Sequence, residues 1–311
     1  GGQVDVHVFA LDAPPRHLRH AQNHLIGFRT LGPTPRFRPL KTTLILIESQ
    51  RIYMNAPAAA KFTEETVLWV KRHTDKLMTF AITRPEGYRF SAGQFSRLGF
   101  RDGEGYLWRA YSIVSAEYDD TLEYFVVLID GGPISAKFAL LQEQDTLLLD
   151  KTVTGFLLPE RFADGRDLVM LCTGSGIAPF LSQLQQADVY QRFERIALVH
   201  SVSHQNELIF NQRVQDLAEH PLVEDYQGKL SFQAVVTREA TDGALNARIP
   251  ELLKDGSLAK ALGWEFAPEH TRFLICGNPA MVHDTFQALL SMGFAMHRNR
   301  IPGQIIMENG F

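Results

Sequence analysis

The sequence predicts a protein of two domains, an antiparallel β-barrel followed by an α/β domain with a parallel, doubly wound sheet. The length of 311 residues fits two domains of ordinary size. From residue 64 to about 155, short runs rich in β-branched and aromatic residues alternate with turn residues, which is typical of a barrel or sandwich. After about residue 166, apolar strands alternate with helices, which is typical of a parallel sheet covered on both faces.

Residues 1–53 differ in composition from the rest of the chain. They carry seven Lys or Arg and three acidic residues, a net charge of +4, whereas residues 54–311 carry −8. A shift of this size predicts a boundary near residue 50. Met54 is the first methionine, and we expect residues 1–53 to be an appended or upstream-translated segment outside the functional fold. The alternative is an N-terminal extension that packs on the core, with a strand within 42–47.

The barrel prediction rests on five strands and one helix, within residues 54–160. The strands are expected at 66–70, 77–82, 110–114, 122–129 and 146–149. The helix is expected at 135–143, because Pro133 precedes it and Ser135 can cap it.

The α/β prediction rests on four apolar strands, each followed by a helix, within residues 161–311. The strands are expected at 168–171, 196–199, 232–236 and 273–276. A Gly-rich turn and an apolar helix follow the first strand. Further helices are expected at 206–219, near 248–254 and at 279–291.

Composition and charge exclude several classes of protein. Two cysteines, Cys172 and Cys276, cannot form a disulfide framework, a four-Cys zinc site or a plant-type iron–sulfur cluster, and we expect no metal site. The net charge of −4 gives no general reason to expect nucleic-acid binding. No apolar run is long enough to span a membrane, so we expect no membrane insertion.

Two motifs of the barrel segment suit an anionic ligand with a flat ring. In Arg109-Ala110-Tyr111-Ser112, the Arg can pair with a phosphate, the Tyr can stack on a ring and the Ser can bond its edge. An Arg on an exposed strand face is the plainer alternative. In Gly131-Gly132-Pro133-Ile134-Ser135, backbone N–H groups and a hydroxyl at a helix start can bind phosphate. An ordinary turn and N-cap would have the same sequence.

Two motifs of the α/β segment follow strands, where ligands of open α/β sheets bind. Cys172-Thr173-Gly174-Ser175-Gly176-Ile177-Ala178-Pro179 lies between a strand and a helix, and its glycines allow a pyrophosphate to approach the backbone. Cys276-Gly277-Asn278-Pro279 ends the fourth strand and leaves room for a flat ring. Arg238 and Arg248 are candidates for a 2′-phosphate site. Each of these features has a plainer alternative. The Gly-rich segment could be only a tight connection between strand and helix, Cys276 could be a buried structural residue, and the two arginines could be solvated surface charges.

Taken in this order, the motifs resemble those of the ferredoxin–NADP(+) reductase family, over about residues 64–311. The strings closest to the bacterial branch, also called flavodoxin/ferredoxin–NADP reductases, are Arg109–Ser115, Val199-His200, Val236–Glu239, Ala247–Pro250 and Ile275–Val282. The resemblance implies an FAD-binding barrel and a Rossmann-like NADP(H)-binding domain, whose cofactor rings meet between them.

The resemblance also implies roles for individual residues. Arg109 would hold an FAD phosphate, Tyr111 would lie against the isoalloxazine, and Ser112 would sit by its N5. The other implied FAD contacts are Ala110, Phe125, Val126, Val127, Pro133, Ile134 and Ser135. The implied NADP(H) contacts are Thr173, Gly174, Ser175, Gly176, Ser203, Arg238, Arg248, Cys276, Gly277 and Asn278. Ser112, Cys276 and Glu308 would be the residues nearest the reacting atoms.

The C-terminus completes the implied site. Glu308 matches a family carboxylate near the active site, and Phe311 matches an aromatic that stacks on the FAD adenine. Gly310 falls where relatives carry a residue over the flavin, so we expect the nicotinamide to reach the flavin without displacing a stacked ring. Several relatives have an Arg that binds the NADP phosphate where this chain has Ser203, so its preference for NADPH would depend on Arg238 and Arg248.

The activity implied by the resemblance is hydride transfer between nicotinamide C4 and flavin N5, coupled to one-electron exchange with ferredoxin or flavodoxin. A cytoplasmic monomer is expected, with a basic docking face to which Lys71, Arg72, Arg84, Arg97 and Arg101 contribute. The alternatives are an NAD(P)H-dependent oxygenase reductase component or a flavin reductase, which share the two domains. A third alternative is a flavin-binding electron shuttle without nicotinamide turnover.

Overall fold

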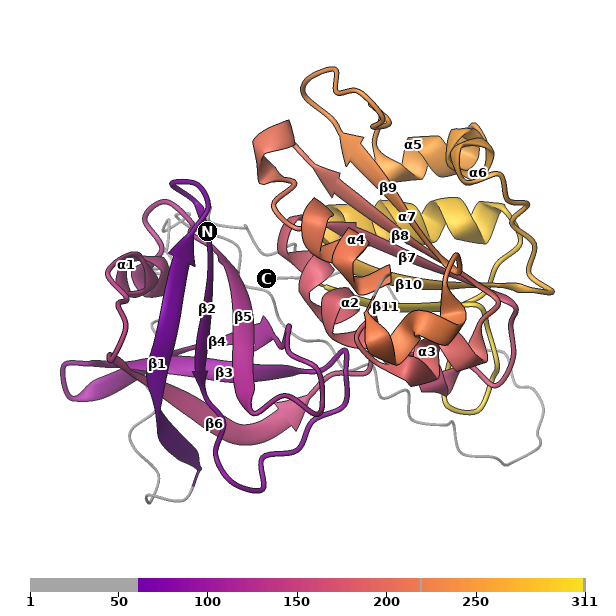
Figure 1. The fold of residues 1–311 in the computed structure, drawn as a ribbon. Helices are drawn as coiled ribbons and strands as arrows, with labels where there is room; N and C mark the ends of the chain where they lie inside the picture. The colour runs from indigo at the N-terminus through magenta and orange to yellow at the C-terminus, as the bar shows by residue number, and fades with distance from the viewer. Residues whose placement is uncertain (1–60, 219, 310–311) are drawn as a thin grey trace, which may run out of the picture. The chain divides into compact units, whose positions relative to one another are not determined.

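The computed structural model of the chain describes residues 61–309 except residue 219 (Figure 1). All of these residues belong to one compact unit, Ile52–Phe311. The prediction for residues 1–53 therefore lies outside the described residues, as do Gly310 and Phe311.

Six antiparallel strands form the first domain, in the order β4-β3-β6-β1-β2-β5. They are β1 (Phe62–Arg72), β2 (Leu77–Thr83), β3 (Phe95–Asp102), β4 (Gly105–Ser112), β5 (Thr121–Val127) and β6 (Thr146–Thr154). The residue after β4 closes the sheet into a barrel, because Ile113 pairs with Tyr124 of β5 in an antiparallel bridge. The predicted barrel is confirmed.

One helix, α1 (Pro133–Ala139), covers an end of the barrel. The predicted start at 135 and the predicted cap at Ser135 are wrong, because the helix begins at Pro133 with Gly132 as its N-cap. It also ends four residues before the predicted boundary at 143. A competing side chain explains the early end. The Arg72 guanidinium donates to the carbonyl oxygens of Ala139 (2.8 Å) and Leu141 (3.0 Å), which satisfies the acceptors that a longer helix would use.

Five parallel strands form the second domain, in the order β11-β10-β7-β8-β9. They are β7 (Asp167–Thr173), β8 (Arg195–Val202), β9 (Leu230–Val236), β10 (Thr271–Gly277) and β11 (Ile305–Asn309). Numbered by their order along the chain and read from β9, the strands follow the order 3-2-1-4-5. Successive strands are therefore added on one side of β7 as far as β9 and on its other side from β10 onward, so the strand order reverses between β7 and β10. The predicted parallel sheet is confirmed, and β11 adds a strand that the sequence pattern did not predict.

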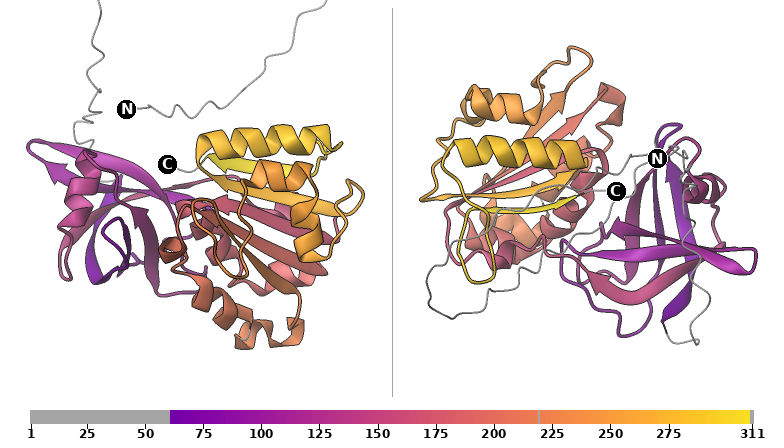
Figure 2. Two further views of the ribbon diagram at one scale, coloured as in Figure 1. Left: turned by 90° about the horizontal axis from the view of Figure 1, so that it is seen from above. Right: turned by 180° about the vertical axis from the view of Figure 1, so that it is seen from behind.

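Helices cover both faces of this sheet (Figures 1 and 2). One face carries α2 (Ala178–Gln183), α3 (Ala187–Arg192) and α4 (Asn211–Ala218). The other carries α5 (Ile249–Lys254), α6 (Ser257–Leu262) and α7 (Pro279–Ser291). Each face has its own apolar cluster, as expected for strands buried on both sides. In the described part of the chain, none of the helices is long and apolar enough to cross a membrane.

The single helix predicted at 206–219 is wrong. A 3-10 turn at Gln205–Glu207 comes first, and α4 begins only at Asn211. Between them, Leu208 leaves the helical conformation with ψ at 53°. Phe210 then packs edge-on against Phe125 of the barrel, with 4.9 Å between ring centroids. This packing requires a break that helical periodicity alone does not reveal.

Candidate active site

The loops after β7 and β10 meet at the point where the strand order reverses. The two strands pair in register up to Cys172 and Cys276. Directly beyond this pair, the backbone N–H of Asn278 donates to Thr173 Oγ1 at 3.0 Å. Two of the predicted motifs are thereby joined at the crevice where open α/β sheets bind nucleotides.

Glycine is required at two places in this crevice. An ideal Cβ on Gly176 would lie 2.3 Å from the carbonyl oxygen of Cys276. One on Gly277, whose φ is +148°, would lie 2.2 Å from Thr173 Oγ1. Gly174 differs, because nothing lies within 4 Å of the corresponding point and its φ is +50°. The loop is thus closely packed against β10 and open at Gly174.

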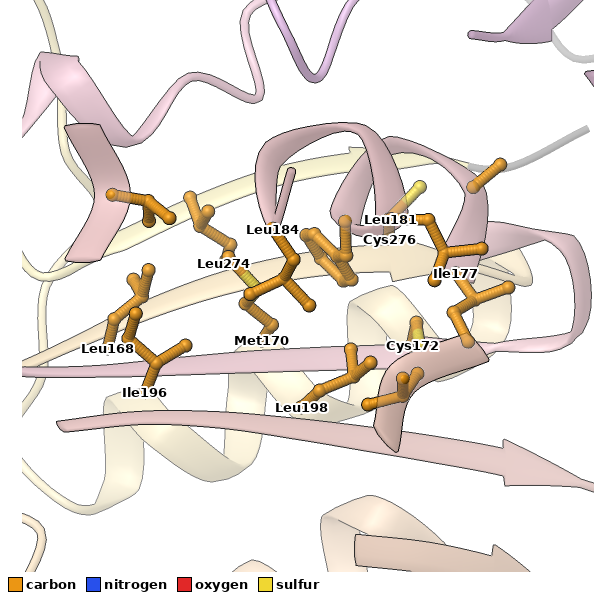
Figure 3. Close-up of a cluster of buried hydrophobic side chains, with 14 of the residues drawn as sticks. Leu168, Met170, Cys172, Ile177, Leu181, Leu184, Ile196, Leu198, Leu274 and Cys276 are labelled. Carbon is orange, nitrogen blue, oxygen red and sulfur yellow. The ribbon is translucent and has the colours of Figure 1, made fainter. Parts of the chain in front are cut away.

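Cys276 is flanked in the sheet by Cys172 on β7 and Glu308 on β11. Figure 3 shows the two cysteines among the apolar side chains between the sheet and α2. Burial raises the pKa of both thiols, so they are protonated at neutral pH. Burial also raises the pKa of Glu308 to about 7. The site therefore holds one carboxyl group that can take up or release a proton near neutral pH.

The predicted 2′-phosphate residues lie at the ends of β8 and β9. The Arg238 N–H donates to the Ser203 carbonyl oxygen at 3.0 Å, which brings these two residues together. Arg248 lies directly before α5. Both arginines are exposed, and neither forms an ion pair with a described residue. Their charges remain available to an anionic ligand.

On the barrel, Arg109-Ala110-Tyr111-Ser112 occupies the end of β4. Arg109 is exposed and makes no side-chain hydrogen bond or ion pair with any described residue. Tyr111 packs edge-on against Phe138 of α1 (5.2 Å between centroids), and burial raises the pKa of its hydroxyl. Ser112 pairs with Phe95 of β3, and its hydroxyl has no partner among the described residues.

The side chains of β5 alternate between two environments. Val126 lies in the barrel core, whereas Phe125 and Val127 face the apolar cluster of the second domain. Val126 can therefore reach a cofactor only through its backbone. Nearby, Ile134 packs in the barrel core, and Ser135 Oγ accepts the N–H of Ile129 at 2.9 Å. The hydroxyl of Ser135 keeps its own proton for a further hydrogen bond.

Direct hydrogen bonds join the two domains beside this site. Ser182 Oγ on α2 donates to the Ser115 carbonyl oxygen at 2.6 Å, and Gln185 Nε2 donates to that of Val114 at 2.8 Å. Ile177 of the Gly-rich loop and Phe125 of β5 belong to the same apolar cluster. The loop after β7 thus packs against β10 of its own domain and against β5 of the barrel.

Four of the five cations expected at a docking face already bind within the chain. Arg72 holds the end of α1, and Arg84 Nη1 donates to the carbonyl oxygens of Glu117 and Asp119. Arg97 pairs with Asp150 and Arg101 with Glu64. Lys71 forms no side-chain hydrogen bond or ion pair with another described residue. The predicted docking face stays a prediction, and these internal contacts reduce the charge that the four arginines can offer to a partner.

Comparisons with known proteins agree with this geometry. Residues 170–287 match the oxidoreductase NAD-binding domain family. A ferredoxin–NADP reductase A of Sorangium cellulosum is 37% identical over 264 residues, which cover 80% of this chain and 90% of the relative. The chain belongs to the ferredoxin–NADP reductase family.

Other members of the reductase family show the same relationship. The flavodoxin/ferredoxin–NADP reductase of Escherichia coli is 35% identical over 217 residues, covering 70% of this chain and 85% of the relative. The crystal structure of a ferredoxin NADP+ reductase from Neisseria gonorrhoeae, with bound FAD and NADP, is 65% identical. It covers 81% of this chain and all of its own, with a TM-score of 0.77.

One residue beneath the Gly-rich loop belongs to the Val199-His200 string of the resemblance, but the sequence predicted no role for it. His200 is buried on β8, and its Nε2 lies 3.0 Å from the carbonyl oxygen of Gly174. A lone His in an apolar strand gives no signal of such a contact, because only the parallel register places it beside Cys172.

Proposed function

We propose that this chain carries FAD and transfers electrons between NADP(H) and a one-electron protein carrier, ferredoxin or flavodoxin. The observation that carries the proposal is the position of the Gly-rich loop after β7. The loop packs on the end of β10 at Gly176 and shares an apolar cluster with β5 through Ile177. A dinucleotide on this loop would face the barrel strand that carries Phe125.

The barrel residues fit FAD. Arg109 is an exposed cation without a hydrogen bond or ion pair to any other described residue, and it suits a phosphate of the cofactor. The aromatic face of Tyr111 suits the ring, and the Ser112 hydroxyl, which has no partner among the described residues, suits its polar edge. Phe125, Val127 and the backbone of Val126 would line the same ligand. When bound, FAD supplies a ring that exchanges a hydride with a nicotinamide and passes electrons on singly.

The second domain fits NADP(H). Thr173, Gly174, Ser175 and Gly176 would lie against the pyrophosphate, and Cys276 to Asn278 against the nicotinamide. Ser203, Arg238 and Arg248 would bind the 2′-phosphate, and the two arginines form no ion pair with a described residue. Glu308 would hold or release a proton beside the nicotinamide, because its pKa of about 7 keeps both protonation states accessible.

The domain division follows from these assignments. Residues 54–160 would form the FAD-binding domain and residues 161–311 the NADP(H)-binding domain. The six antiparallel strands end at Thr154 and the five parallel strands begin at Asp167, which supports a boundary between these two residues.

Steady-state oxidation of NADPH with different acceptors tests the proposal. The purified chain should contain yellow FAD and oxidise NADPH rapidly when oxidised ferredoxin or flavodoxin is the acceptor. NADH should be a poorer donor. Faster turnover with free flavin than with either protein would instead indicate a flavin reductase. Bound FAD without NADPH oxidation would indicate an electron shuttle.

An Arg109→Ala variant links this activity to the barrel site. Because Arg109 would be the main cation on the FAD phosphates, the variant should be purified with less FAD. Its activity should return when excess FAD is added. An unchanged FAD content would contradict the assignment of Arg109.

A further inference from the structure

His200 is a buried polar residue in an apolar strand. It lies on β8 between Cys172 of β7 and Ala234 of β9, and only 1% of its surface is exposed. Ile196 and Leu198, which precede it at intervals of two residues, belong to the apolar cluster beneath α2. Because side chains on a strand alternate, His200 faces the same way, toward the loop that leads into α2.

The imidazole makes one hydrogen bond. Its Nε2 lies 3.0 Å from the carbonyl oxygen of Gly174. A carbonyl oxygen can only accept, so Nε2 must carry the proton and donate it. The opposite nitrogen, Nδ1, is buried and has no partner among the described residues. Burial lowers the pKa of His200 to about 4, so the ring is neutral at physiological pH.

If His200 had only a structural role, its buried Nδ1 atom would lower the stability of the fold without any benefit. A buried acceptor without a donor destabilises the fold, and an aromatic hydrocarbon side chain would avoid the cost. Among the described residues, the only hydrogen bond that the imidazole gains is the one from Nε2 to the loop. A specific need for that bond would explain why a His occupies this position.

The loop is held on one side by β10 and on the other by His200. Toward β10, Asn278 donates to Thr173 and Gly176 packs on the Cys276 carbonyl. Between these two points lies Gly174, in the left-handed region at φ +50° with open space above it. Glycine has no intrinsic preference for this conformation, so a hydrogen bond to its carbonyl helps to select it.

We propose that His200 is a positioning residue for dinucleotide binding. Its Nε2–H holds the Gly174 carbonyl and so fixes the backbone of residues 174–176 in the form that receives the pyrophosphate of NADP(H). The inference rests on the proposed function, because it assumes that this loop binds the dinucleotide. His200 itself would not touch the nicotinamide or the flavin.

Three variants of the FAD-loaded protein test the inference. His200→Phe keeps a ring and removes the donor. His200→Gln keeps a donor, because an extended Gln places its amide nitrogen about where Nε2 lies. Leu198→Ala is the matched control, since it truncates a buried side chain on the same face of the same strand that cannot form a hydrogen bond with Gly174. For each variant, NADP+ is titrated while the absorbance spectrum of the bound flavin is recorded, and melting temperature and FAD content are measured.

The His200→Phe variant should bind NADP+ about three- to tenfold more weakly, the effect of losing one hydrogen bond. Its KM for NADPH should rise by a similar factor with kcat little changed, because the bond acts equally before and during hydride transfer. The His200→Gln variant should recover most of the affinity. Leu198→Ala should lower the melting temperature and leave the affinity for NADP+ as in the parent.

Three results would overturn the inference. They are a His200→Phe affinity within twofold of the parent, an equal loss in His200→Gln and His200→Phe, and an equal loss in Leu198→Ala. Failure of the parent protein to bind FAD or NADP+ would contradict the proposed function itself and this inference with it. The parent measurement therefore separates the two failures.

Discussion

Replacing Gly176 with Ala tests the close packing between the loop after β7 and the end of β10. An ideal Cβ at Gly176 would lie 2.3 Å from the carbonyl oxygen of Cys276 and 2.6 Å from its carbonyl carbon. Ordinary contacts begin at 3.4 Å, so the loop or the strand must move by about 1 Å. Both atoms are backbone, and neither can rotate away.

The Gly176→Ala substitution should mainly slow the reaction with NADPH. A displacement of this size in a site that aligns two reactants can reduce the rate about 100-fold. Overpacking costs about 1–3 kcal/mol of stability. We therefore expect kcat/KM for NADPH to fall about 10- to 100-fold in Gly176→Ala, with the melting temperature lowered by several degrees. The FAD content should be retained, because the barrel motif is untouched.

The assay is NADPH oxidation with a saturating protein carrier, beside a matched glycine variant. Gly228 has φ +82° and nothing within 4 Å of an added Cβ, and it lies at the amino end of β9, away from the crevice. Gly228→Ala should cost some stability through its backbone conformation and leave kcat/KM unchanged. A Gly176→Ala enzyme with kcat/KM within twofold of the parent would refute the reasoning.

Three further predictions follow from charges in the second domain. Arg238→Ala and Arg248→Ala should each raise KM for NADPH about tenfold or more and leave KM for NADH unchanged, because only NADPH carries the 2′-phosphate; equal effects on both donors would contradict the assignment. Glu308→Gln should remove a step near pH 7 from the pH profile of kcat/KM for NADPH, since burial raises the pKa of this carboxyl to about 7; a step that persists would assign it to another group. Asp167 is fully buried, and hydrogen bonds from Arg166 and Arg195 overcome desolvation and lower its pKa to about 2. The folded state should therefore keep about 2 kcal/mol above pH 4 and lose it as pH falls toward 2, and thermal melts of Asp167→Asn should lack this acid loss.

Local signals predicted the elements whose boundaries are local. The predicted helix at 279–291 matches α7 from end to end, because Asn278 caps it and Pro279 begins it. The strands β7, β8 and β10 are also evident from local sequence, because strands that are buried on both faces appear as continuous apolar runs. Such signals need no knowledge of the neighbouring elements.

Elements fixed by tertiary packing were missed or misplaced. β3 was missed because Arg97, Gly99 and Arg101 interrupt its apolar pattern, although Asp150 and Glu64 pair with the two arginines in the fold. The short helices α3 and α6 and the edge strand β11 also give too few residues for a periodic pattern.

In the candidate site, too, local features were predicted from the sequence and contacts between distant segments were not. Its motifs were evident in the sequence, because glycines and an Arg between apolar runs stand out. The contacts between motifs were not, since the bond from Asn278 to Thr173 spans 105 residues. His200 was evident only as part of the Val199-His200 string, and no role was predicted for it, because that role depends on a carbonyl oxygen 26 residues away.

Single-turnover absorbance measurements test electron transfer from NADPH through FAD to the carrier. The FAD-loaded protein is mixed with one equivalent of NADPH in the absence of oxygen, and then with at least two equivalents of oxidised ferredoxin or flavodoxin, because each carrier accepts one electron. We expect rapid bleaching of the flavin by NADPH, slower bleaching by NADH, and recovery of the yellow colour when the carrier is added. A flavin that NADPH does not bleach, or that neither carrier reoxidises, would contradict the proposed function.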